Sequence, residues 1–129
     1  MAIFGVGTDL ASISRVREAV SRYGDRFLDR VFTPAEVSYA RAKAHPEESL
    51  AARFAAKEAC FKAIGTGWPT EGVSFRDVEV VRSDGEPPRL VLAGRLAELA
   101  GERGVRRFHL SLSHAGDHAI AMVVAEGDG

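Results

Sequence analysis

The spacing of hydrophobic and polar positions changes after the first few residues of the chain. Residues 2–9 alternate in the manner of a β-strand and include two glycines. From Ser12 or Ser14 onward, hydrophobic residues recur at helical spacing as far as Phe27, with Gly24 as an interruption or C-cap. The pattern therefore predicts a strand over 2–9 followed by a helix.

Two more helices are predicted from their end signals. The sequence T-P-A-E at 33–36 is a capping box with proline at the first helical position, and it opens a helix that ends near Ala44. The sequence P-E-E at 46–48 opens a third helix, with acidic residues at the positive end of the helix dipole. That helix runs to about Ile64, where G-T-G at 65–67 stops it.

The second half of the chain is mostly strand-like. The predicted elements are strands over 78–82 and 89–93 around the hairpin signal Asp84-Gly85, a short helix over 96–103, and strands over 108–113 and 118–126 around a turn at 115–117. Strands joined by such turns pair antiparallel. We therefore predict an α+β fold, an antiparallel sheet packed with helices, as a single domain over residues 1–129.

Length and composition narrow the class of protein. The chain has 129 residues, close to the commonest size for one domain, with 46% hydrophobic and 27% charged residues, the balance of an ordinary globular protein. The sequence has no apolar run long enough to span a membrane and no signal-like leader, so we expect a cytoplasmic protein without membrane contact. The lone Cys60, expected in the core, cannot form an internal disulfide, which fits a reducing compartment.

The net charge of −1 conceals a basic segment. Residues 12–62 hold ten Arg or Lys and seven Asp or Glu, a net charge of +3. The rest of the chain holds seven Arg or Lys and eleven Asp or Glu, a net charge of −4. Arg15, Arg22 and Arg26 share one helical face if the helix continues past Gly24, and such a face favours an acidic partner. The alternative is a solvated face on which neighbouring acids neutralise them. Aromatic residues do not alternate with these arginines, so no nucleic-acid partner is expected.

The helix predicted to end at Ile64 carries charges beside its apolar stripe. At about 100° per residue, four hydrophobic residues fall within roughly 80° of one another, namely Leu50, Phe54, Phe61 and Ile64. Lys57 lies inside this stripe and Glu58 at its edge, with Arg53 and Lys62 one helical turn away. One interpretation is that these charged side chains pair with one another on the surface. The other is that they surround phosphates and a divalent ion, whose charges would offset the free-energy cost of placing charged groups near the core.

Asp9, at the end of the first predicted strand, is the natural second carboxylate for such an ion. Mg²⁺ prefers one or two protein carboxylates together with waters and phosphate oxygens. As an alternative, Asp9 is an ordinary turn residue. Gly5 and Gly7 lack the third glycine of a dinucleotide-binding fingerprint, so we expect them to allow close backbone packing instead.

Polar residues also gather where the next-to-last predicted strand meets its turn. Ser111 and Ser113 share a face of that strand and either bind phosphate or face water, and His114 follows them. His109 and His118 lie nearby, but no cysteine joins the three histidines and their spacing fits no common zinc motif. Zinc is therefore not expected.

Three segments together resemble a known family. They are GVGTDLASISRV near the start, LAARFAAKEACFKAIGTG in the middle and HLSLSHAGDHAIAMVVAE at the end. In order, spacing and total length they resemble the holo-[acyl-carrier-protein] synthases, the small bacterial 4′-phosphopantetheinyl transferases. The resemblance implies that family's fold, Mg²⁺ as cofactor and a role in fatty acid biosynthesis. The implied reaction moves 4′-phosphopantetheine from coenzyme A to a serine of apo acyl carrier protein and releases adenosine 3′,5′-bisphosphate.

The resemblance also implies roles for particular residues. Asp9 and Glu58 look like the catalytic carboxylates that hold the metal, and Lys62 looks like the catalytic residue that grips the pyrophosphate. The other expected contacts to coenzyme A are Arg53, Lys57, Ser113 and His114. Arg15 resembles the basic residue that meets the acidic carrier protein, and helical spacing adds Arg22 and Arg26 to the expected partner surface. The family further implies a homotrimer with each active site at a subunit interface.

The chain departs from the family pattern in three places. Thr8 stands where relatives commonly have Ile or Leu, and Ser12 stands where they commonly have an acidic residue. Ala44 and His45 stand where relatives often carry adjacent basic residues. The base that deprotonates the acceptor serine stays open between Glu58 and a metal-bound water. Two other functions also stay open: the same transfer to a carrier domain of a large synthase, and noncatalytic binding of coenzyme A or a nucleotide.

Overall fold

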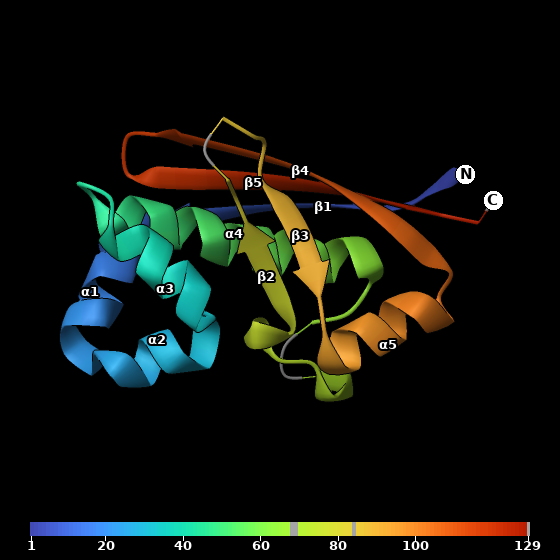
Figure 1. The fold of residues 1–129 in the computed structure, drawn as a ribbon, viewed down its shortest axis with the longest axis horizontal. Helices are drawn as coiled ribbons and strands as arrows, with labels where there is room; N and C mark the ends of the chain where they lie inside the picture. The colour runs from blue at the N-terminus through green and yellow to red at the C-terminus, as the bar shows by residue number, and fades with distance from the viewer. Residues whose placement is uncertain (68–69, 84, 129) are drawn as a thin grey trace.

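A three-stranded antiparallel sheet supports one long helix in this protein. The computed structural model describes residues 1–67, 70–83 and 85–128. The sheet has the order β1-β5-β4, formed by β1 (Ala2–Ser12), β5 (His118–Gly127) and β4 (Val105–Ala115). Helix α4 (Pro46–Ile64) lies along one face of this sheet (Figure 1). A second antiparallel pair, β2 (Val78–Val81) and β3 (Arg89–Leu92), packs on the far side of α4.

The remaining helices gather near the two ends of α4. Three of them, α1 (Ile13–Tyr23), α2 (Asp25–Val31) and α3 (Pro34–Arg41), lie together near its N-terminal end, and α5 (Gly94–Glu102) lies toward the other (Figure 1). Two short 3₁₀ turns, η1 (Thr70–Gly72) and η2 (Phe75–Asp77), precede β2. The predicted α+β class, with helices packed on antiparallel sheet, is confirmed.

One predicted boundary was wrong, and one predicted interruption was confirmed. Strand β1 does not end at Asp9, because its pairing with β5 continues until Ser12 lies opposite His118. Asp9 is therefore inside a strand and is not a turn residue. The helical segment after β1 is interrupted at Gly24 as expected, since Gly24 adopts a φ of 55°, is the C-cap of α1 and separates α1 from α2.

The other end signals gave the right elements. The capping box is present, with Glu36 N donating to Thr33 Oγ1 and Thr33 N donating to Glu36 Oε1. Helix α4 begins at Pro46 and ends at Gly65, which adopts the left-handed conformation of a C-cap. Of the hairpin signal between β2 and β3, Asp84 lies outside the described residues. No helix within the described ranges is long and apolar enough to cross a membrane.

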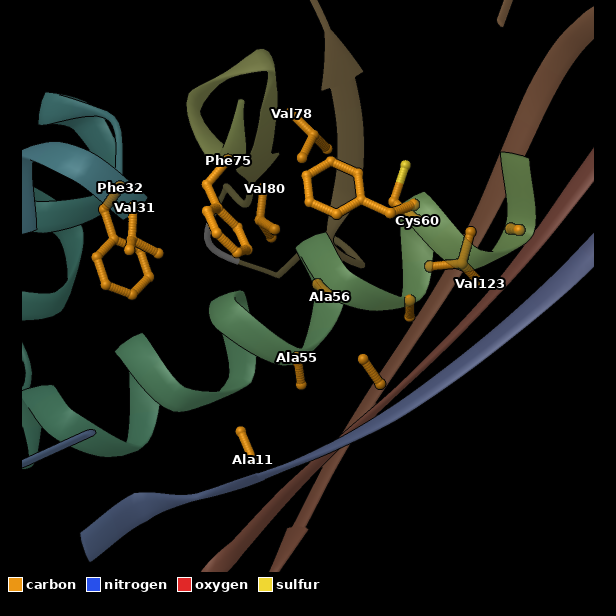
Figure 2. Close-up of a cluster of buried hydrophobic side chains, with 14 of the residues drawn as sticks. Ala11, Val31, Phe32, Ala55, Ala56, Cys60, Phe75, Val78, Val80 and Val123 are labelled. Atoms are coloured by element: carbon orange, nitrogen blue, oxygen red, sulfur yellow. The ribbon is translucent and has the colours of Figure 1, made fainter. Parts of the chain in front are cut away.

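Helix α4 is buried on two opposite sides. Its alanines face the sheet, where Ala55 and Ala59 have no exposed surface. Its larger residues face η2 and β2, the side of α4 on which Figure 2 shows Phe75, Val78 and Val80. Phe61 lies against Phe75 there, with ring centroids 5.5 Å apart. The predicted apolar stripe forms this second side, with Leu50, Phe61 and Ile64 buried and Phe54 partly buried.

Two glycines bring α4 against β1 at backbone contact distance. A Cβ placed on Gly7 would stand 1.9 Å from Ala59 O, and one placed on Gly5 would stand 2.1 Å from Ala63 O. No side chain fits at either position. The prediction that Gly5 and Gly7 allow close backbone packing is confirmed.

The opposite face of the sheet is exposed and apolar. Strand residues alternate between the two faces, so the residues between the glycines of β1 point away from α4. Five large hydrophobic side chains on β1 and β5, each at least 40% exposed, define what we call the outer sheet face: Phe4, Val6, Leu10, Ile120 and Met122. This concentration is unusual for a surface that meets only water.

Asp117, in the turn between β4 and β5, fixes the start of α1. Its carboxylate accepts hydrogen bonds from Ser12 Oγ at 2.8 Å, Ser14 Oγ at 2.7 Å and Ser14 N at 2.9 Å. Ser12 is the N-cap of α1, and its Oγ accepts from Arg15 N. These bonds lower the pKa of Asp117, because they stabilise its charged form.

Candidate active site

Asp9, Glu58 and Lys62 come together where β1 meets the C-terminal half of α4. Asp9 is on the same face of β1 as Gly5 and Gly7, so the close approach of α4 brings its carboxylate to the helix. Lys62 Nζ lies 3.2 Å from Asp9 Oδ1 and donates to Thr8 O at 2.9 Å. The Asp9 side chain is only 18% exposed, whereas that of Lys62 is half exposed.

The electrostatics of this carboxylate pair favour a cation. The pKa of Glu58 is raised, first by burial and then by the negative charge of Asp9, while Lys62 opposes both effects. A divalent cation between the carboxylates would relieve the repulsion. No group of three or more His, Cys, Asp or Glu side chains suited to a metal occurs in the described ranges. Two carboxylate ligands fit Mg²⁺, which retains several waters, better than an ion that needs a full protein cage.

A second centre is a cavity of about 350 Å³ beside the N-terminal half of α4. Its walls come from α3 and the turn after it, α4, the residue after β2, and β4. They consist of Tyr39, Lys43, Ala44, His45, Glu48, Ser49, Ala52, Arg53, Arg82, Leu112, Ser113 and His114. We call this cavity the cationic pocket, because three Arg or Lys and two His side chains face a single carboxylate there.

Arg53 forms the buried wall of the cationic pocket. It is 4% exposed, donates from Nη1 to Ser49 Oγ at 2.8 Å, and has its guanidinium carbon 4.2 Å from the centre of the Tyr39 ring. Its Nε is buried and has no hydrogen-bond partner. Burial lowers the pKa of Arg53; Tyr39 and Glu36 partly oppose this effect, and the charge of Arg82 adds a smaller lowering. A phosphate in the pocket would offset both penalties.

Lys57 does not belong to either centre, which corrects its expected role as a phosphate contact. Its side chain has no exposed surface, and Nζ lies 2.8 Å from Glu36 Oε1. Nζ also donates to Phe75 O at 2.9 Å and Val78 O at 2.5 Å. Lys57 lies in the buried part of α4 as its position predicted, but a carboxylate of the same chain provides the compensating charge. Burial nevertheless lowers the pKa of Lys57.

The structure thus divides the predicted site residues into two groups. Arg53, Ser113 and His114 line the cationic pocket, while Asp9, Glu58 and Lys62 form the other centre; the roles of all six stay predictions. Sequence reasoning missed Tyr39 and Arg82. Neither lies in a segment with a recognisable spacing, so only the fold could bring them to the pocket.

The other residues singled out from the sequence have simpler surroundings. Cys60 is buried as predicted, and burial raises the pKa of its thiol to about 12, so it is inert as a nucleophile. His109 bonds to Glu126 across the sheet, apart from His114 in the cationic pocket. Ser111 is exposed on β4 and does not line the pocket.

The predicted row of arginines is divided between two helices. Arg15 and Arg22 are on α1, but Arg26 is on α2, so a continuous helical face past Gly24 was the wrong reason to group them. The exposed Tyr23 joins them instead, because it lines one shallow cavity with Arg15 and Arg22 and the next with Arg26. The side chain of Arg15 forms no ion pair within the described ranges.

The sequence and the fold match one class of enzyme. The family model of the 4′-phosphopantetheinyl transferase superfamily matches residues 5–123, and the chain belongs to this superfamily. A holo-[acyl-carrier-protein] synthase from Koribacter versatilis is 48% identical over 124 residues, which cover 96% of this chain and 98% of that protein.

Solved structures show the same similarity. The crystal structure of holo-[acyl-carrier-protein] synthase from Neisseria meningitidis superposes with a TM-score of 0.86 at 37% identity, covering 96% of this chain and 98% of that one. The synthase from Helicobacter pylori, in complex with coenzyme A, superposes with a TM-score of 0.81 at 33% identity, covering 94% and 99%.

Proposed function

We propose that this chain transfers 4′-phosphopantetheine from coenzyme A to a serine of apo acyl carrier protein. The observation that carries the proposal is the Asp9–Glu58 carboxylate pair with Lys62 beside it, in a member of the 4′-phosphopantetheinyl transferase superfamily. Similarity to a synthase solved with coenzyme A supports this substrate. The reaction would release adenosine 3′,5′-bisphosphate and serve fatty acid biosynthesis.

The chain's own residues suit phosphoryl transfer. The serine hydroxyl gives its proton to a base, for which Glu58 is the candidate among this chain's residues, and its oxygen bonds to the phosphorus that carries pantetheine. The bond from that phosphorus to the bridging oxygen breaks and leaves its electrons on the bisphosphate. Charge neutralisation and positioning supply most of the catalysis in such a reaction. Mg²⁺ held by Asp9 and Glu58 would supply positive charge at the pyrophosphate. Lys62, which is half exposed, can turn from Asp9 toward the leaving phosphate.

The cationic pocket suits the bisphosphate end of coenzyme A. Arg53 brings an unpaired Nε and a buried positive charge, and Lys43 and Arg82 add two cations from neighbouring elements. His114 and Ser113 line the β4 side of this pocket.

A homotrimer with active sites between subunits would bring the two centres to one ligand. Asp9 is on the β1 edge of the sheet and Leu112 on the β4 edge, with Ala121 of β5 between them under α4. Arg53 and Lys62 are about 180° apart around α4 at 100° per residue. Within one chain, the helix therefore separates the pocket from the carboxylate pair. A second copy docked on the outer sheet face would supply the missing half.

The decisive experiment uses mass spectrometry of apo acyl carrier protein incubated with this chain, coenzyme A and Mg²⁺. We expect the carrier protein to gain the mass of one phosphopantetheine group, with adenosine 3′,5′-bisphosphate as co-product. Binding of coenzyme A without this gain would indicate a noncatalytic module. Faster turnover on an excised carrier domain of a large synthase would change the assigned acceptor. The buried thiol of Cys60 fits the reducing cytoplasm, where we place this activity.

A further inference from the structure

The buried Lys57–Glu36 pair has every polar atom satisfied. The three protons of Lys57 Nζ have three acceptors, namely Glu36 Oε1, Phe75 O and Val78 O. Glu36 Oε1 also accepts from Thr33 N at 2.9 Å, and Oε2 accepts from Val80 N at 2.8 Å. Both side chains are fully buried. A buried ion pair adds little net stability compared with apolar residues of the same shape, so stability alone is a weak reason for this arrangement.

The network joins three elements that each contribute to a wall of the cationic pocket. Glu36 is on α3, whose C-terminal half carries Tyr39. Val80 is on β2, and Arg82 follows two residues later. Lys57 is on α4, one helical turn after Arg53. One ammonium and one carboxylate thus connect three of the four walls.

The contact between Arg53 and Tyr39 depends on this connection. Their cation–π contact, at 4.2 Å, joins α4 to α3 at the pocket surface. The Arg53–Tyr39 contact lies one helical turn from the buried Lys57–Glu36 pair on each helix. On α4, Arg53 and Lys57 are four residues apart, and on α3, Glu36 and Tyr39 are three residues apart. A shift of α3 relative to α4 would separate the guanidinium from the ring. Arg53 Nε would then lose its direction toward a bound anion.

We propose that Lys57 and Glu36 are positioning residues that set the affinity of the cationic pocket for coenzyme A. The identity of coenzyme A as the ligand rests on the proposed function. The positioning role differs from the direct phosphate contact that the sequence led us to expect of Lys57. It predicts a change in coenzyme A binding, with little change in the turnover rate once coenzyme A is saturating. Asp9 and Lys62 meet on the β1 side of α4, outside the network.

The test compares dissociation constants for coenzyme A, measured by calorimetry on the full chain. Glu36→Gln keeps the shape of the side chain but removes its charge, and Glu36→Gln/Lys57→Met removes both charges. We expect each variant to bind coenzyme A about tenfold more weakly, which corresponds to about 1.4 kcal/mol. At saturating coenzyme A, kcat should stay within about threefold of wild type, because the reacting groups keep their places.

Leu99→Ala is the matched control for a general loss of stability. Leu99 is buried on α5, so its truncation weakens the core without touching the pocket walls. Circular dichroism at the temperature of the calorimetry would establish that each variant is folded. If folded Glu36→Gln weakens coenzyme A binding no more than Leu99→Ala does, the positioning role is wrong. The same holds if kcat falls while coenzyme A binding is unchanged.

A double-mutant cycle with Tyr39→Leu separates positioning from simple packing. If Glu36 acts through the Arg53–Tyr39 contact, the two substitutions should be markedly less than additive in their effect on coenzyme A binding. Additive effects would contradict the proposed route. Because binding needs no turnover, failure of the wild-type chain to modify the carrier protein would count against the proposed function alone.

Discussion

Gly7 and Ala59 meet so closely that the carbonyl oxygen of Ala59 would stand 1.9 Å from a Cβ at position 7. The oxygen belongs to the backbone of α4, so it cannot turn aside as a side chain could. We expect Gly7→Ala to push α4 off β1 and to cost more than about 3 kcal/mol of unfolding free energy. Chemical denaturation would measure this loss. Gly101→Ala is the control, since a Cβ at Gly101 meets nothing within 4 Å.

Asp9→Ala and Glu58→Ala should each abolish most phosphopantetheine transfer and leave the fold intact. Each substitution removes one of two carboxylates that would hold a hydrated ion, so we expect turnover to fall by about 100-fold or more. Steady-state assays across a Mg²⁺ titration would measure the effect. Glu47→Ala is the control, because Glu47 is an acid on the same helix that pairs with Arg17 and lines neither centre. Near wild-type turnover at limiting Mg²⁺ would show that the altered residue is not a ligand.

Arg15→Glu should raise the KM for acyl carrier protein by about tenfold and leave the KM for coenzyme A nearly unchanged. Arg15 has no ion-pair partner within the described ranges, whereas Arg22 pairs with Glu18 at 3.6 Å on the exposed surface. Charges at the rim of an interface act mainly on association, so added salt should reduce the difference. Arg106→Glu makes the same charge change at the other end of the sheet. Equal effects on both substrates would remove α1 from the docking surface.

Met122→Glu should prevent self-association. Met122 is 46% exposed at the centre of the outer sheet face, and a carboxylate there would be buried without a partner when a second copy docks. Light scattering should then give a single chain of 13.9 kDa, and transfer should be lost with assembly. Val91→Glu is the control, because Val91 is similarly exposed but lies on β3. Full activity of a monomeric wild-type chain would contradict the interfacial site.

Asp117→Asn should destabilise the protein in a pH-dependent way. The pKa of Asp117 is lower in the folded chain than its ordinary 3.8, so its contribution is fully present above pH 3.8 and is lost as pH falls through the folded pKa. The difference in melting temperature between wild type and Asp117→Asn should therefore be greatest near neutral pH and shrink in acid. Thermal melts followed by circular dichroism would measure it. A constant difference at all pH values would show that the charge of Asp117 contributes nothing.

Local patterns predicted the elements well, because capping and helix stops depend on residues a few positions apart. The capping box at Thr33 and the stop at Gly65 are of this kind, and both are present. Position on a helix also indicated that Lys57 is buried. Its counter-charge could not be predicted, because Glu36 is 21 residues away and reaches it only through the packing of α3 on α4.

The same limit applied to the candidate site. The resemblance identified residues within matching segments, and the fold brought Asp9 to Lys62 as that assignment requires. Tyr39 and Arg82 are far apart in sequence and meet only at the cationic pocket. The hydrogen bonds from Ser12 and Ser14 to Asp117 span more than 100 residues, so turn chemistry alone could not reveal them.

The order of strands in the sheet has a consequence for how the chain folds. Strand β1 pairs only with β5, so Ala2 lies opposite Gly127, whereas β4 and β5 are neighbours in sequence. Closing the long loop between β1 and β5 costs more entropy than closing the β4–β5 hairpin. We expect amide protons of the hairpin to become protected first in pulse-labelled hydrogen exchange, and earlier protection of β1 would contradict this. A ribosome must therefore have released β5 before β1 can gain its strand partner, so the sheet beneath α4 is completed late in synthesis.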